Sequence, residues 1–140
     1  MPPTPPDHPR SRAGWAVLRV LLVLESLLLV GVLIFSVTAA IGSVGPLAQN
    51  VSIVAMAVLV LAWVAITAVA ALRGRPSWVR GSALTIHVLL FAGGTGCLQL
   101  GIGSWQFGFA LVAGALLGFA AAVLARPDER PVYDEDGRAV

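Results

Sequence analysis

Two ionisable side chains, Glu25 and His87, lie inside long apolar stretches of the sequence. Glu25 is the only acid between Asp7 and Asp128. A charged side chain at mid-bilayer depth costs at least ~2.5–3.5 kcal/mol on insertion scales, so an acid inside a membrane span usually faces a partner or a cavity. These two residue types could form a protonatable pair or a buried hydrogen bond, provided that the fold brings them together.

Arginines near the start of each stretch indicate the depth of the two residues. Glu25 lies six residues beyond Arg19, which is roughly 9 Å at helical rise, and His87 lies seven residues beyond Arg80. His87 also shares a helix face with Gly94, where a neighbouring helix can approach closely. We therefore expect a Glu25–His87 contact in the inner half of a helix bundle.

Three interpretations of this candidate pair are open. It could couple proton movement to transport or gating. It could be a structural hydrogen bond between a protonated acid and a neutral imidazole, as burial disfavours charge. Glu25 could instead pair with an arginine of a partner protein.

The sequence contains no other cluster with catalytic character. There is no metal-ligand spacing, no phosphate-binding loop and no Ser-His-Asp set, and Ser26 does not face its helical neighbour Glu25. The single Cys97 excludes an internal disulfide. The sequence therefore predicts no enzyme, no metal site and no cofactor.

The composition indicates a membrane protein. Of 140 residues, 58% are hydrophobic and 11% are charged, against a usual charged fraction of ~25%, and the mean hydropathy is +0.90. Lipid cannot satisfy backbone polar groups, so long apolar runs must be helices. We expect an all-α polytopic protein whose domain at 14–125 is a four-transmembrane-helix bundle, with helices at about 16–41, 51–72, 82–100 and 105–125. A proline-rich cytoplasmic arm, 1–13, and a polar cytoplasmic tail, 126–140, are both expected to be disordered.

The distribution of arginine predicts the orientation of the chain. All nine basic residues are arginines, and they flank the apolar runs, whereas the loops at 42–50 and 101–104 have none. By the positive-inside rule, both termini of this multi-pass protein are cytoplasmic in a cell membrane. The arginines should meet anionic lipid headgroups rather than nucleic acid. Three tryptophans at the predicted helix ends are expected to be interface anchors: Trp15, Trp78 and Trp105.

Small residues predict where helices pack. Helices in lipid associate through close contact, which small side chains permit. The fourth run has such a residue every four positions, and the third run adds Gly94; the predicted packing residues are Gly94, Ala110, Gly114, Gly118 and Ala122. We expect packing within the bundle, and the same stripes could build a homo-oligomer or dock a membrane-protein partner.

The layout has two resemblances. A short four-span chain with an acid in the first helix superficially resembles the small multidrug resistance transporters, and only Glu25 matches their first-helix glutamate. The strong arginine bias, the 15-residue tail and the absence of the surrounding motifs depart from that family. In layout and in its lysine-free, Ala/Val/Arg-rich composition, the chain is similar to small uncharacterised integral membrane proteins of actinobacteria, which implies four spans and no particular activity.

The sequence supports two functional hypotheses. The first is a non-enzymatic accessory or scaffold subunit of a membrane complex, whose small-residue stripes and polar tails meet partners. The alternative is a small proton-coupled transporter or channel that uses Glu25 and His87.

Overall fold

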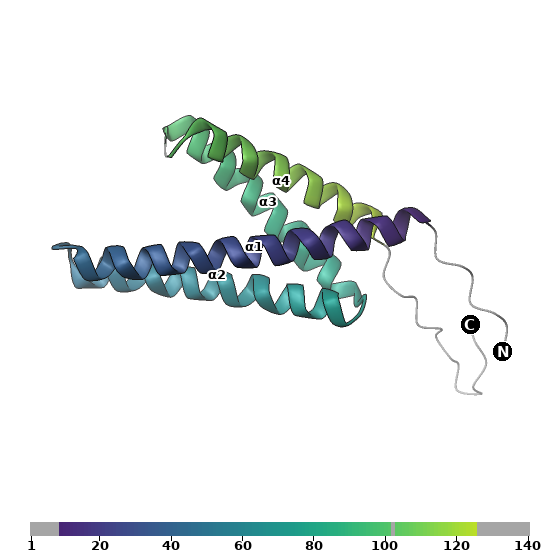
Figure 1. Ribbon diagram of the computed structural model, residues 1–140, viewed down its shortest axis with the longest axis horizontal. Helices are drawn as coiled ribbons and strands as arrows, with labels where there is room; N and C mark the ends of the chain where they lie inside the picture. Colours follow the sequence, from purple (N-terminus) through teal and green to yellow (C-terminus); the bar gives the residue numbers. More distant parts are fainter. Residues whose placement is uncertain (1–8, 102, 126–140) are drawn as a thin grey trace.

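The computed structural model describes residues 9–101 and 103–125, which form four helices joined by short turns (Figure 1). Each helix is long and apolar enough to cross a membrane. The all-helical fold predicted from the apolar runs is confirmed. The helices are α1 (Pro9–Gly42), α2 (Leu47–Arg73), α3 (Ser77–Leu100) and α4 (Trp105–Leu124).

Residues with special backbone or capping properties mark the helix ends. Pro9 is the first residue of α1, and Pro46 and Pro76 directly precede α2 and α3, where the missing proline N–H removes no helical hydrogen bond. Ser104 caps α4 by accepting a hydrogen bond from the N–H three residues later, at 3.3 Å. Gly101 follows α3 with a φ of 65°, the left-handed conformation that glycine adopts most readily.

Three helices begin earlier than the apolar runs predict. Residues 9–13, predicted to belong to the disordered arm, are the first turn of α1, while α2 begins at Leu47 rather than 51 and α3 at Ser77 rather than 82. Hydropathy marks where a helix becomes apolar, not where its backbone starts. The early start of α1 is supported by packing, because Ser11 and Gly14 are both buried. Residues 1–8 of the arm and the predicted tail at 126–140 lie outside the described residues.

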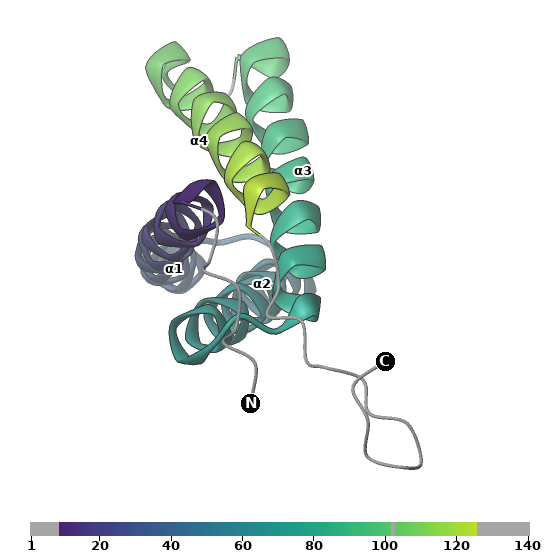
Figure 2. The same ribbon diagram turned by 90° about the vertical axis from the view of Figure 1, so that its right-hand side faces the viewer.

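The four helices form two antiparallel hairpins, α1–α2 and α3–α4, that cross at a wide angle (Figures 1 and 2). The hairpins pack together near the end where α1 begins and α4 ends, and they diverge toward the opposite end. The four helices therefore do not pack as a bundle along their full length. Close packing of all four is confined to one half, called the inner half here.

The hydrophobic core lies in this inner half. Its buried side chains come from the first four turns of α1, the end of α2, the beginning of α3 and the end of α4. The diverging outer halves leave large apolar side chains exposed on all four helices. The core members are Trp15, Leu18, Leu22, Val64, Ala68, Ala71, Val79, Ala83, Ile86, Ala121, Ala122 and Ala125.

Each hairpin contains an arginine that binds the end of its second helix. The Arg19 Nε atom on α1 donates to the carbonyl of Ala71 on α2, at 2.7 Å. The Arg80 Nε atom on α3 donates to the carbonyl of Ala122 on α4, at 3.1 Å. The last carbonyls of a helix lack partners within it and carry partial negative charge, so a guanidinium stabilises them. These arginines, expected only to reach for lipid headgroups, thus join the two helices of each hairpin.

Substitution of Gly14 tests the packing of the inner half. A Cβ at this position would lie 2.9 Å from the backbone nitrogen of Ala125. We expect Gly14→Val to reduce the free energy of unfolding in detergent by about 1–3 kcal/mol, as overpacking does in other cores. Gly31→Val is the matched control, since no atom lies within 4 Å of a Cβ there. Equal stability of the two variants would contradict the packing of α1 on the end of α4.

Candidate functional site

Glu25 and His87 meet where the two hairpins cross. The Oε1 atom of Glu25, on α1, lies 3.1 Å from Nε2 of His87, on α3. The side chain of His87 is fully buried and that of Glu25 is 15% exposed. The structure thus brings together the two residues that the depth argument placed at the same level. Their contact joins the first hairpin to the second.

The other imidazole nitrogen of His87 is bound within its own helix. Nδ1 lies 2.6 Å from the carbonyl oxygen of Ala83, one turn earlier. A carbonyl oxygen only accepts hydrogen bonds, so Nδ1 carries a proton in this contact. Nε2 is therefore the nitrogen that is free to accept or release a proton toward Glu25.

This arrangement allows two states with the same net charge. In one, a protonated Glu25 faces a neutral His87, and in the other a carboxylate faces an imidazolium. Both states are neutral as a pair, which suits a buried site better than one isolated charge. The two carboxyl oxygens and Nε2 are buried, and the 3.1 Å approach is not aligned as a hydrogen bond. The contact is thus an electrostatic one in this arrangement.

Gly118 on α4 makes room for the imidazole. A Cβ at this position would overlap the ring of His87. The neighbouring contact between α3 and α4 is equally close, since a Cβ at Gly94 would lie 3.0 Å from side-chain atoms of Leu111 and Val112. Gly94 and Gly118, both predicted as packing residues, therefore each lie at a tight helix–helix contact.

The remaining small residues of the predicted stripe do not lie on one packed face. Ala122 is buried, whereas Ala110 is exposed and no atom lies within 4 Å of a Cβ at Gly114. Four residues span about 400° of a helix, so a four-residue repeat drifts about 40° at each step. The buried face of α4 follows a spacing of seven instead, through Gly108, Ala115 and Ala122.

The tryptophans differ in their surroundings. Trp78 and Trp105 are 51% and 66% exposed, as an interface anchor requires. Trp15 is only 1% exposed and belongs to the core, which contradicts its predicted role as an anchor. The cause is the early start of α1, which places Trp15 in the second turn of a packed helix rather than at a helix end.

A polar cluster between α2 and α3 has no obvious signal in the sequence. The indole N–H of Trp63 donates to the hydroxyl of Ser82 at 2.9 Å, and the hydroxyls of Ser82 and Thr67 lie 2.8 Å apart. Single serines and threonines are common in apolar helices, so their spacing alone does not reveal partners on another helix. The cluster connects the two hairpins within the inner half, because it lies late in α2 and early in α3.

Within the part of the chain that the structure describes, no group of three or more His, Cys, Asp or Glu side chains could hold a metal ion. Cys97 is a half-buried free thiol on α3. The chemistry that the described geometry supports is therefore proton exchange within the Glu25–His87 pair.

Comparison of the chain with known protein families, with curated proteins and with solved structures finds no match. The resemblance to actinobacterial membrane proteins accordingly stays a prediction, and the functional argument depends on the geometry alone.

A double-mutant cycle measures the coupling between the two residues. We expect Glu25→Ala and His87→Ala each to lower the free energy of unfolding, because each leaves a buried polar partner unsatisfied. The double variant should lose less than the sum of the two, with a coupling energy of about 0.5–3 kcal/mol in denaturant titrations.

Ser26 provides the control for this cycle. Its hydroxyl donates to the carbonyl of Leu22 in its own helix, at 2.7 Å. The effects of Ser26→Ala and His87→Ala should therefore add. Additive effects of the Glu25 and His87 substitutions as well would contradict the pairing.

Proposed function

We propose that the chain is a multi-pass protein of the cell membrane with a non-enzymatic, accessory or scaffolding role. The observation that carries the proposal is the divergence of the two hairpins, which leaves the outer half of each hairpin uncovered by the other. A protein whose only role was to fold upon itself would gain contact by closing this angle. We infer that the outer halves are surfaces for the helices of a partner.

The small residues of the outer halves support this proposal. No atom lies within 4 Å of a Cβ at Gly31, Gly93, Gly96 or Gly114, so these positions contribute no close packing inside the chain. Small residues on a membrane helix permit another helix to approach closely. In this view Glu25 and His87 hold the hairpins in their crossed arrangement.

The proposed orientation has both termini in the cytoplasm. Arg19 and Arg80 bind carbonyls at the ends of α2 and α4, so both lie at the end of the molecule where α1 begins and α4 ends. Arg73 ends α2 at that same end, and Arg75 lies in the turn that follows. The positive-inside rule places such an end on the cytoplasmic side.

Substitution of Gly114 tests the scaffold proposal. Gly114→Leu should leave thermal stability in detergent unchanged, because the position has room, and should reduce the amount of co-purifying membrane protein at least about tenfold. The leucine side chain would keep the partner helix from approaching closely, and the interface would lose the packing on which it depends. The measurement is quantitative mass spectrometry after purification in mild detergent.

Gly81→Leu is the matched control. Gly81 lies near the start of α3, also has no atom within 4 Å of a Cβ, and belongs to the inner half. It should retain its co-purifying partners. Unchanged recovery in the Gly114 variant, or no stoichiometric partner of the native chain, would overturn the proposal.

A second candidate function is proton-coupled transport or conduction. The buried 3.1 Å contact between an acid and an imidazole at the hairpin crossing favours it, because a proton moving between the two atoms would change the interaction that joins the hairpins. Movement of the hairpins could then be linked to protonation.

Glu25→Gln separates the two candidates. Glutamine preserves the shape of the side chain and removes its titration, so under the transport hypothesis proton flux in liposomes should fall to the protein-free background. Ser26→Ala serves as the control and should retain the native flux. Native flux that survives Glu25→Gln, or no flux in the native protein, would contradict the transport hypothesis.

A further inference from the structure

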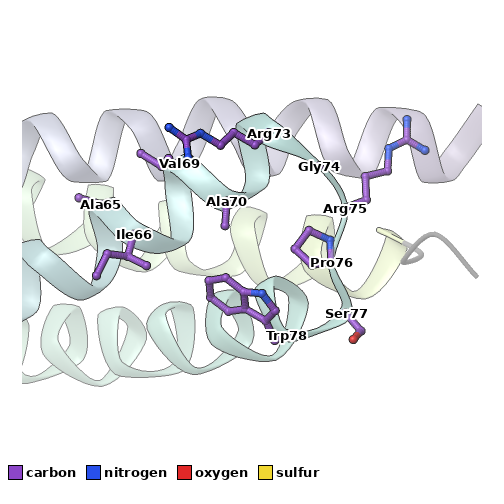
Figure 3. Close-up of a pocket in the computed structure, with 10 residues that line it drawn as sticks. All are labelled: Ala65, Ile66, Val69, Ala70, Arg73, Gly74, Arg75, Pro76, Ser77 and Trp78. Carbon is purple, nitrogen blue, oxygen red and sulfur yellow. The ribbon is translucent and has the colours of Figure 1, made fainter. Parts of the chain in front are cut away.

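A large groove lies where the first hairpin continues into the second (Figure 3). It has a volume of about 1190 Å³ and is bounded by the last turns of α2, the turn at residues 74–76 and the first turn of α3. The groove exists because α2 and α3 diverge directly after the turn, as the crossing of the hairpins requires. Its volume exceeds the roughly 300–1,000 Å³ of typical small-molecule pockets.

One wall of the groove is apolar. Ile66 and Val69 line it from α2, and both are exposed. Trp78 lines the groove from α3, and Figure 3 shows its indole between the ribbons of the two helices, on the same side of α2 as Ile66. An aromatic ring with one polar atom is typical of the boundary between hydrocarbon and headgroups.

The rim of the groove is cationic. Arg73 and Arg75 flank Gly74 at the turn, and Figure 3 shows their guanidinium groups on opposite sides of this turn. No hydrogen bond or ion pair joins Arg73 to another described residue. Glu25 is the only acid among those residues, and it contacts His87. Arg73 therefore offers charge to a ligand from outside the chain.

We propose that this groove binds one anionic phospholipid. The phosphate lies at Arg73, and an acyl chain runs along Val69 and Ile66 against the indole of Trp78. Arg73 is seven residues beyond Ile66, about 10 Å along the helix, so a headgroup at the guanidinium places its chain on the apolar wall. A soluble anion would use the rim and leave this wall without a partner. The inference rests on the proposed membrane placement.

The test uses the fluorescence of the full-length chain in mild detergent. Phosphatidylglycerol with brominated acyl chains quenches a nearby indole, and brominated phosphatidylcholine is the zwitterionic comparison. We expect half-maximal quenching by phosphatidylglycerol at a concentration at least about tenfold lower than by phosphatidylcholine. Trp78→Phe should abolish this high-affinity component, which assigns it to the groove.

Two variants of equal net charge test the role of the rim. Arg73→Gln should weaken phosphatidylglycerol binding about fivefold, from one lost charge near an anionic headgroup. Arg12→Gln removes the same charge from an exposed position outside the groove and should change binding less than about twofold. If both variants weakened phosphatidylglycerol binding equally, the binding would reflect general charge attraction, and the proposed site would be overturned.

Three further outcomes are decisive. Equal quenching by the two lipids would overturn the preference for an anionic headgroup. Displacement by water-soluble glycerol phosphate at the same concentration as the lipid would show a phosphate site without an acyl-chain subsite, which also overturns the proposal. Failure of the chain to reconstitute into phosphatidylcholine vesicles would contradict the membrane placement itself, whereas reconstitution without lipid preference contradicts the groove alone.

Discussion

The contact between Glu25 and His87 is the interaction on which the rest of the arrangement depends. It places the only acid of the described residues against their only histidine, at the point where two helical hairpins cross. The Nδ1 proton of His87 is donated to a carbonyl of its own helix, so Nε2 is the nitrogen that faces the carboxyl group. The pair is then neutral in either state, which is how two ionisable groups can be tolerated inside an apolar core. Gly118 is part of the same constraint, because any side chain there would displace the imidazole.

The crossing of the hairpins explains the other main features. Close packing is confined to the inner half, where the arginine contacts of Arg19 and Arg80 join the helices within each hairpin. The outer halves diverge and present apolar surface with small residues. Divergence of α2 and α3 from their common turn opens the groove beside Arg73 and Trp78. The proposed partner surface and the proposed lipid site thus both result from the crossing of the two hairpins.

The sequence predicts some of these features and not others, for physical reasons. Four long apolar runs predict four helices, because the length and hydropathy of a run can be read directly from consecutive residues. The depth of Glu25 and His87 follows from helical rise counted from arginines. The crossing angle does not follow, because it depends on which helix faces touch. The burial of Trp15 was missed because hydropathy does not mark the early start of α1. Ala110 and Gly114 leave the packed face because a four-residue repeat drifts around the helix. The carbonyl contacts of the arginines were also missed, since an arginine beside an apolar run is equally suited to lipid headgroups.

The most direct test of the central claim is a solid-state NMR measurement in lipid bilayers on protein labelled with ¹⁵N in histidine and ¹³C in glutamate. The only other residues of these two types are His8, Glu129 and Glu135, so the signals of the pair can be assigned with Glu25→Gln and His87→Asn variants. The account predicts magnetisation transfer from the Nε2 atom of His87 to the carboxyl carbon of Glu25, as a 3.1 Å nitrogen–oxygen contact requires. A bilayer sample in which both residues give well-resolved signals but no transfer between them would contradict it.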